Sequence, residues 1–92
     1  MTLLDIFQNK SQFATRKVGS EMVLVPLKNN IAHMDKLFTM NEVACFIWEN
    51  IDGQHTKDEI LASITEAFDI DIKTAEIDYV EFIESITNMM NE

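Results

Sequence analysis

The chain has few of the residues that mark disulfide-bonded, low-complexity or membrane-spanning proteins. Its 92 residues include a single cysteine, two glycines and one proline. One cysteine cannot form a disulfide within the chain, which favours a reducing compartment. No apolar run approaches the roughly 20 residues that a membrane-spanning helix needs. No basic residue precedes the first apolar residues, as a secretory signal would require. We therefore expect a cytoplasmic protein without a membrane segment.

Basic residues are also scarce, and the charge is uneven along the chain. The formal net charge is −9, with 47% hydrophobic residues, which is typical of one compact domain. Residues 1–39 carry five Lys or Arg against three Asp or Glu, whereas residues 40–92 carry two against thirteen. The acidic half would repel phosphate backbones and attract basic partners. A solvated helical surface that only keeps the protein soluble is the equally weighted alternative.

The first part of the chain predicts three short β-strands. Phe13–Val18 and Met22–Leu27 are separated by Gly19-Ser20, a common turn pair. A second turn is expected at Lys28-Asn29-Asn30, because Asn tolerates a positive φ. A third strand should then follow at about Ile31–Lys36. The predicted sheet is a three-stranded antiparallel meander.

After residue 39 the apolar spacing changes to that of helices. Thr39-Met40-Asn41-Glu42 and Thr56-Lys57-Asp58-Glu59 both fit the capping-box pattern at a helix start. The first helix should end at Asp52-Gly53, and a third should run from about Lys73 to Met89. The predicted inward positions of the three helices are, in order, Met40, Val43, Ala44, Ile47, Trp48 and Ile51; Ile60, Leu61, Ile64, Ala67 and Phe68; Ala75, Tyr79, Phe82, Ile83, Ile86 and Met90. This order predicts an α+β fold like a winged helix-turn-helix, a three-stranded sheet followed by a three-helix bundle.

The sequence offers little for catalysis. His33 and His55 are the only imidazoles, and neither is at metal-ligand spacing from the other or from Cys45. Cys45 is interpreted as a buried, inert thiol and His55 as a solvated turn residue. There is no glycine-rich phosphate loop, nucleophile elbow or paired-cysteine motif. We expect no enzyme activity, no metal site and no cofactor.

Winged-helix domains commonly bind DNA, but the charge of the third predicted helix argues against that role here. It carries Glu76, Asp78, Glu81 and Glu84, and Lys73 is its only basic residue. A DNA-reading helix needs the opposite sign for contact with phosphates. We expect no nucleic-acid partner.

The same helix has apolar residues away from its predicted core stripe. Ile77 and Val80 point towards the side that carries Glu84, at about 100° per residue. Such an apolar strip bordered by acids could hold side chains of a bound peptide. In the alternative, Val80 flanks the core and Ile77 is a lone exposed residue.

The stretch Met40–Gly53 resembles the signature of the PqqD-like family, named for protein D of pyrroloquinoline quinone biosynthesis. The matching features are Asn41, Ala44, Ile47-Trp48 and Ile51-Asp52-Gly53, followed by Thr56-x-x-Glu59-Ile60, Phe68-x-Ile70, Asp78-Tyr79, Phe82-Ile83 and Ile86. Met40 replaces the usual Leu, and Asn88–Glu92 replaces the usual glycine-hydrophobic-hydrophobic tail. The resemblance covers residues 13–90, which leaves residues 1–12 as an N-terminal extension.

The resemblance implies a non-catalytic recognition element for ribosomally made, post-translationally modified peptides. In similar domains the leader segment of a precursor peptide adds as a strand to the third strand's edge, against the third helix. The candidate peptide-binding residues are therefore Ile31, Ala32, His33, Met34, Asp35, Lys36, Ile77, Val80 and Glu84.

Partners follow from the same resemblance. The chain would act as a peptide chaperone that presents the leader to a modifying enzyme, such as a radical S-adenosylmethionine protein, in pyrroloquinoline quinone or related biosynthesis. Two alternatives are a leader-binding partner of a lasso-peptide protease and a winged-helix regulator with a protein target. The open sheet edge and the apolar segment Leu3-Leu4-Ile6-Phe7 leave a homodimer possible.

Overall fold

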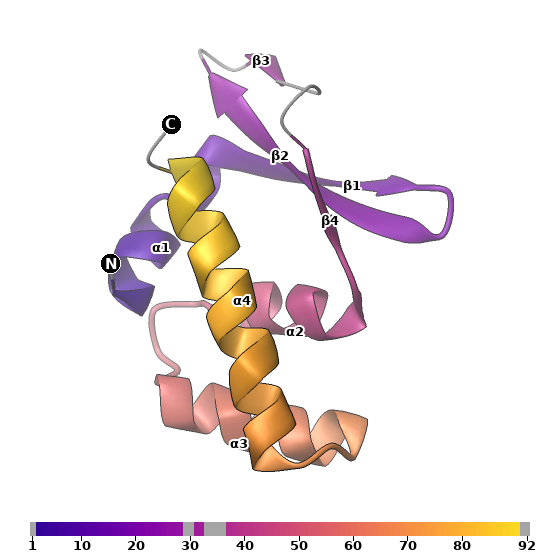
Figure 1. Cartoon of the computed structure of the whole chain (residues 1–92). Helices are drawn as coiled ribbons and strands as arrows, with labels where there is room; N and C mark the ends of the chain where they lie inside the picture. The colour runs from indigo at the N-terminus through magenta and orange to yellow at the C-terminus, as the bar shows by residue number, and fades with distance from the viewer. Residues whose placement is uncertain (1, 29–30, 33–36, 91–92) are drawn as a thin grey trace.

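A computed structural model describes residues 2–28, 31–32 and 37–90 of the chain. After a short N-terminal helix, the strands come first and three longer helices follow, so the predicted α+β class is confirmed (Figure 1). The likeness to a winged helix-turn-helix stays a prediction. Within the described ranges, no helix has both the length and the apolar character needed to cross a membrane. The elements are α1 (Leu3–Gln8), the 3-10 turn η1 (Lys10–Gln12), β1 (Phe13–Val18), β2 (Glu21–Lys28), β3 (Ile31–Ala32), β4 (Phe38–Met40), α2 (Glu42–Asn50), α3 (Lys57–Phe68) and α4 (Ile72–Met90).

Strand β2 is the centre of an antiparallel sheet. Strand β1 pairs with it from Val18↔Glu21 to Phe13↔Pro26. On the chain's return, β3 pairs with Leu27 and Lys28, and β4 pairs with Met22, Val23 and Leu24. The third strand is thus present as two short described segments. The second, β4, was not predicted, and the prediction of a strand over 31–36 is only testable at Ile31–Ala32.

The register tells which backbone groups point outward. A two-residue turn joins residues that exchange backbone hydrogen bonds, so Val18 and Glu21 are such a pair. Because N–H direction alternates along a strand, the even-numbered residues of β2 then face β3 and β4. Pro26, which has no N–H, also faces that side but pairs with no residue of β3 or β4. By the same alternation, the backbone groups of Ala32 and Thr39 point away from β2.

Helix α2 begins differently from the prediction. Asn41 is its N-cap, and the Asn41 side chain accepts a hydrogen bond of 2.8 Å from the Ala44 backbone N–H. Thr39 lies in β4, so the predicted capping box at Thr39 is wrong. Met40 is buried, as predicted, but from the end of a strand and not from a helix. The physical reason is that pairing with β2 keeps the backbone extended through Met40.

Helices α3 and α4 form largely as predicted. Thr56 and Glu59 make both hydrogen bonds of a capping box at the start of α3. Helix α3 ends at Asp69, which adopts the left-handed conformation with φ of 52°. Ala67, predicted to face inward, is exposed because it lies on the solvent side of the last turn. Asp71 accepts a 2.7 Å hydrogen bond from the Thr74 N–H at the start of α4.

The core lies between one face of the sheet and the three long helices. Trp48 is 6% exposed, which confirms its predicted burial. Its aromatic neighbours are Phe13 and Phe82, with ring centroids at 5.9 Å and 6.4 Å. The buried core cluster consists of Ile6, Leu24, Met40, Ala44, Ile47, Trp48, Ile51, Ile60, Leu61, Ile64, Ala75, Tyr79, Phe82 and Ile86.

Side chains of α1 and η1 pack against the rest of the domain. Ile6 of α1 is fully buried within the core cluster. The Phe7 ring lies so close to Gly53 that a Cβ there would approach it to 2.9 Å. Lys10 donates hydrogen bonds from Nζ to the carbonyl oxygens of Trp48 (2.7 Å) and Ile51 (3.1 Å), at the C-terminal end of α2. Helix α1 therefore contributes to the folded domain that the following residues form.

Candidate functional site

A groove is lined by residues of β4, the start of α2 and α4. Its volume is about 200 Å³. We call it the edge groove and define it by its lining residues. They are Phe38, Thr39, Asn41 and Ala44 on the strand side and Asp78, Glu81, Phe82 and Ser85 on the α4 side.

The edge groove has an apolar floor and an acidic rim. The rings of Phe38 and Phe82 lie 6.0 Å apart between centroids and join the two walls. Phe82 is 3% exposed and belongs to the core, so the floor is rigidly supported. Asp78 and Glu81 stand on the α4 wall. The arrangement suits a chain with an apolar side chain to place on the rings and polar or basic groups at the surface.

Thr39 supplies backbone hydrogen-bonding groups that could pair with a bound strand. Strand β4 has no further partner strand among the described residues. The alternation along the strand directs the Thr39 N–H and C=O away from β2, and Thr39 is one of the residues that line the groove. An unpaired edge of this kind can accept an extended peptide through main-chain hydrogen bonds. Phe38 and Met40, on either side, direct their backbone groups towards β2. A bound strand would therefore meet one outward-facing residue within β4.

The predicted strand residues lie beyond the far end of this groove or outside the described chain. Ile31 is 66% exposed and, with Ala32, pairs with the end of β2. His33, Met34, Asp35 and Lys36 lie outside the described residues. The structure does not bring Ile31 into the lining of the edge groove. The role of the predicted strand residues in peptide binding stays a prediction.

The predicted helix residues lie beside the edge groove, on a neighbouring face of α4. Ile77 and Val80 are 54% and 39% exposed. They line a shallow depression of about 460 Å³ with Lys73, Glu76 and Glu81, which we call the α4 strip. Glu81 borders both the strip and the edge groove, whereas Glu84 is exposed and lines neither. The two predicted sets do not share a cavity among those described, and peptide binding by the strip also stays a prediction.

Most of the groove's lining was not predicted from the sequence. Thr39 and Asn41 were assigned to the start of a helix and Phe38 to no element, and Asp78, Phe82 and Ser85 were not proposed as site residues. The apolar-polar-apolar alternation of Phe38-Thr39-Met40 was the signal available in the sequence, since a period of two indicates a strand.

Asp52 and His55, which lie outside the groove, are partners of each other. The Asp52 carboxylate lies 2.9 Å from His55 Nδ1 and accepts backbone hydrogen bonds from Gln54 and His55. The His55 side chain, then the Gln54 N–H, lower the pKa of Asp52 to about 2. His55 was predicted to be solvated; its side chain is 38% exposed but is paired with Asp52. Its own pKa is raised, mainly by that pairing.

Cys45 is half-buried, and its Sγ lies 4.0 Å from the Met40 carbonyl oxygen. Burial raises the pKa of this thiol, and Glu49 and Glu42 add to the rise. A raised thiol pKa disfavours the nucleophilic thiolate. In the described part of the chain, no three His, Cys, Asp or Glu side chains are placed to hold a metal ion.

Comparison with known proteins adds a family to this geometry. The family model described as coenzyme PQQ synthesis protein D (PqqD) matches residues 21–88. That range includes β2, both segments of the third strand and all three long helices, and therefore the whole edge groove. No curated protein and no solved structure matches the chain. Because the matched range covers most of the 92 residues, the chain belongs to the family of PqqD, a protein of coenzyme PQQ synthesis.

Proposed function

We propose that this protein is a non-catalytic peptide chaperone that binds the leader segment of a ribosomally made precursor peptide in the edge groove. The observation that carries the proposal is the position of Thr39, an unpaired edge residue that faces α4 across an apolar floor. The leader would add as a strand beside β4 and set an apolar side chain over Phe38 and Phe82. It would then be presented to a modifying enzyme, such as a radical S-adenosylmethionine protein.

The energetics support a mode that combines backbone and side-chain contacts. A dissociation constant of about 1 μM corresponds to about −8 kcal/mol. A flexible leader must also be ordered, which costs about 2–5 kcal/mol of the gross interaction energy. Each net hydrogen bond contributes only about 1 kcal/mol. The few outward groups near Thr39 are therefore too weak alone, and the apolar floor has to supply most of the affinity.

The groove's charge supports a peptide partner over nucleic acid. Asp78 and Glu81 line the groove, and Glu84 lies on the same helix. These carboxylates repel phosphates and favour basic side chains of a leader. Glu81 connects the groove to the α4 strip, so a leader longer than the groove could extend over Ile77 and Val80.

The test uses the first half of a short precursor encoded beside this gene, made as a synthetic peptide, and isothermal calorimetry. Thr39→Pro removes the outward N–H and, as an edge substitution, leaves the β2 ladder intact. It should weaken binding about tenfold or more, because it also obstructs the partner's matching carbonyl. Thr39→Ala is the control, since it removes the side chain but keeps the N–H. Thr39→Pro that folds and binds like the parent contradicts docking at β4.

Two further variants separate the neighbouring surfaces. Ala32→Pro removes the outward N–H of β3, and Val80→Asp places a charge in the α4 strip without touching the core. Weakening by Ala32→Pro extends the docking edge to β3, and weakening by Val80→Asp extends it over the strip. If all three variants bind the leader like the parent, the peptide docks elsewhere or this chain does not bind it.

A further inference from the structure

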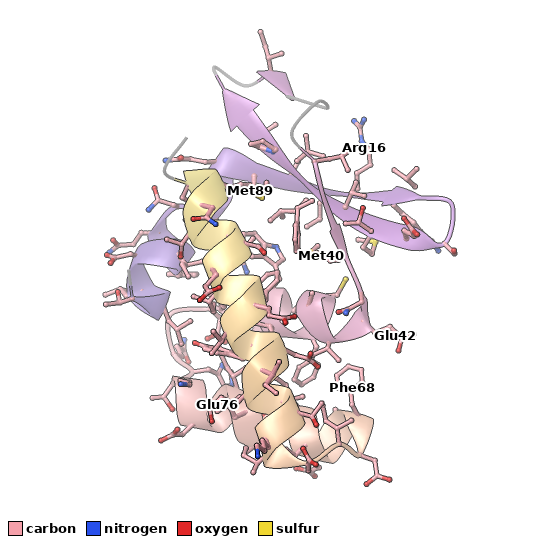
Figure 2. All side chains as sticks on the ribbon, viewed as in Figure 1. Arg16, Met40, Glu42, Phe68, Glu76 and Met89 are labelled. Carbon is pink, nitrogen blue, oxygen red and sulfur yellow. The ribbon has the colours of Figure 1, made fainter. Side chains whose placement is uncertain are left out.

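A second and larger cavity, of about 670 Å³, lies on the other side of β4 from α4. We call it the α2 cavity. It is enclosed by the turn between β1 and β2, the end of β4, the outer side of α2 and the end of α3. Figure 2 shows Met40, Glu42 and Phe68, which all line it, on one side of α4.

The floor of the α2 cavity suits a large apolar side chain. It is formed by Met22, Met40, Cys45, Phe46 and Phe68. Phe46 and Phe68 meet edge to face, with ring centroids 5.4 Å apart, and they give the floor a firm wall. The two thioethers are flexible and polarisable, so they can adapt to side chains of different shape. At about 670 Å³, the cavity has room for a large apolar side chain.

The rim of the same cavity is acidic and has no partner cation in an ion pair. Glu21, Glu42 and Glu49 are exposed, and none of them forms an ion pair within the described ranges. The negative charges of these glutamates act on the floor of the cavity, because Glu49 and Glu42 add to the effect of burial in raising the pKa of Cys45. The nearby Lys10 ammonium donates to the Trp48 and Ile51 carbonyls and also interacts electrostatically with Glu49. A cationic group at this rim would therefore be stabilised.

The α2 cavity adjoins the edge groove. Thr39 and Asn41 line both of them, from opposite sides of the same short segment. An extended chain that pairs with Thr39 and continues past Asn41 leaves the edge groove at the mouth of the α2 cavity. The first residues beyond the paired stretch are thus the ones that can reach its floor and rim.

On the basis of the function proposed above, we propose that the α2 cavity is a specificity subsite for the bound peptide. It takes one bulky apolar side chain, Leu, Ile, Met or Phe, from just beyond the residues that pair with β4. A Lys or Arg adjacent to that residue lies at the glutamate rim. The protein therefore selects peptides in which a basic-apolar pair flanks the strand-forming stretch.

The test selects binders from a displayed library of random peptides, about fifteen residues long, which span about 50 Å when extended. The bait is the full chain, and one enriched peptide is then synthesised. Analogues with the cation replaced by Gln, or the apolar residue by Ala, are measured by calorimetry. The protein variants are Glu49→Lys and Glu21→Lys, with Glu66→Lys on the exposed side of α3 as a charge-matched control. Thermal melts confirm that each variant is folded.

The parent should enrich peptides with the basic-apolar pair. Replacing the apolar residue by Ala should weaken binding about tenfold or more. Replacing the cation by Gln should weaken it about two- to fivefold, the range of exposed ion pairs. Glu49→Lys or Glu21→Lys should remove that cation effect, and Glu66→Lys should preserve it.

Two kinds of failure are distinguishable. In the first, the enriched peptides lose affinity with Thr39→Pro but contain no basic-apolar pair, or their cation effect survives both Glu49→Lys and Glu21→Lys. Either result overturns the subsite but leaves docking in the edge groove in place. If the parent enriches no peptide, or Thr39→Pro does not affect the enriched ones, docking at β4 fails and the subsite fails with it.

Discussion

Ile6→Ala is the change that most directly tests whether the first twelve residues belong to the domain. Ile6 is 0% exposed and lies in the core cluster with residues from β2, β4 and the three long helices. The change deletes three carbon atoms, worth about 0.8 kcal/mol each in transfer free energy. The cavity left behind adds to this, so we expect a loss of about 3–4 kcal/mol in the free energy of unfolding. That is a large share of the about 5–15 kcal/mol of a whole domain.

Urea unfolding followed by the fluorescence of Trp48, the chain's single tryptophan, measures this loss. With a denaturant slope of about 1.5 kcal/mol/M, the midpoint should fall by about 2 M. Leu4→Ala is the matched control, because Leu4 is on the same helix but 53% exposed. It should shift stability by no more than about 0.5 kcal/mol. Equal, small effects of both variants would show that α1 is a detachable extension and would refute the packing argument.

Four other outcomes follow from the structure. Lys10→Met should cost about 2 kcal/mol by removing a charged donor from carbonyls at the end of α2, whereas Lys17→Met on the exposed β1 should be neutral in the same unfolding assay. Trp48→Ala should cost about 3–5 kcal/mol, so a variant that melts within a few degrees of the parent would place the ring at the periphery. In NMR titration, His55 should titrate above its ordinary pKa of 6.5, and in Asp52→Asn its pKa should return towards that value. The stabilisation from the Asp52–His55 pair is lost as the pH rises through the raised pKa of His55. It is also lost as the pH falls from 3.8 through the Asp52 pKa of about 2. Duplex DNA should bind weakly or not at all at physiological salt, and submicromolar, sequence-selective mobility shifts would contradict the charge argument.

The helices were the most predictable part of the fold. At Thr56, the cap residue, the partner Glu59 and the following apolar stripe all agree on one start, and the structure has that start. Before α2, Thr39 and Asn41 are both good cap residues, and Met40 fits the apolar spacing of a strand as well as that of a helix. Local sequence cannot decide between them. Pairing of β4 with β2 decides it, through contacts between residues more than a dozen positions apart.

The candidate site was predictable only in outline. A spacing of about 100° per residue correctly placed Ile77 and Val80 outside the core stripe of α4. It could not show which side of the helix β4 passes, and β4 passes the side that carries Asp78, Phe82 and Ser85. The chain from Ala32 to Phe38 also has three more residues than the part of β2 that it faces, between the pairs Leu24↔Phe38 and Leu27↔Ala32. No turn signal in the sequence fixes such an offset, so β4 was not predicted, and docking at Ile31–Lys36 stays a prediction.

That offset limits what can assemble on the protein by accident. A long, straight sheet edge recruits any strand of another chain, and this is a common route to aggregation. Here β3 offers two residues and β4 three, in registers that differ, so no incoming strand can pair one-for-one along both. On this side of the sheet, a stray strand would therefore gain only the few backbone hydrogen bonds that one of the two described segments offers.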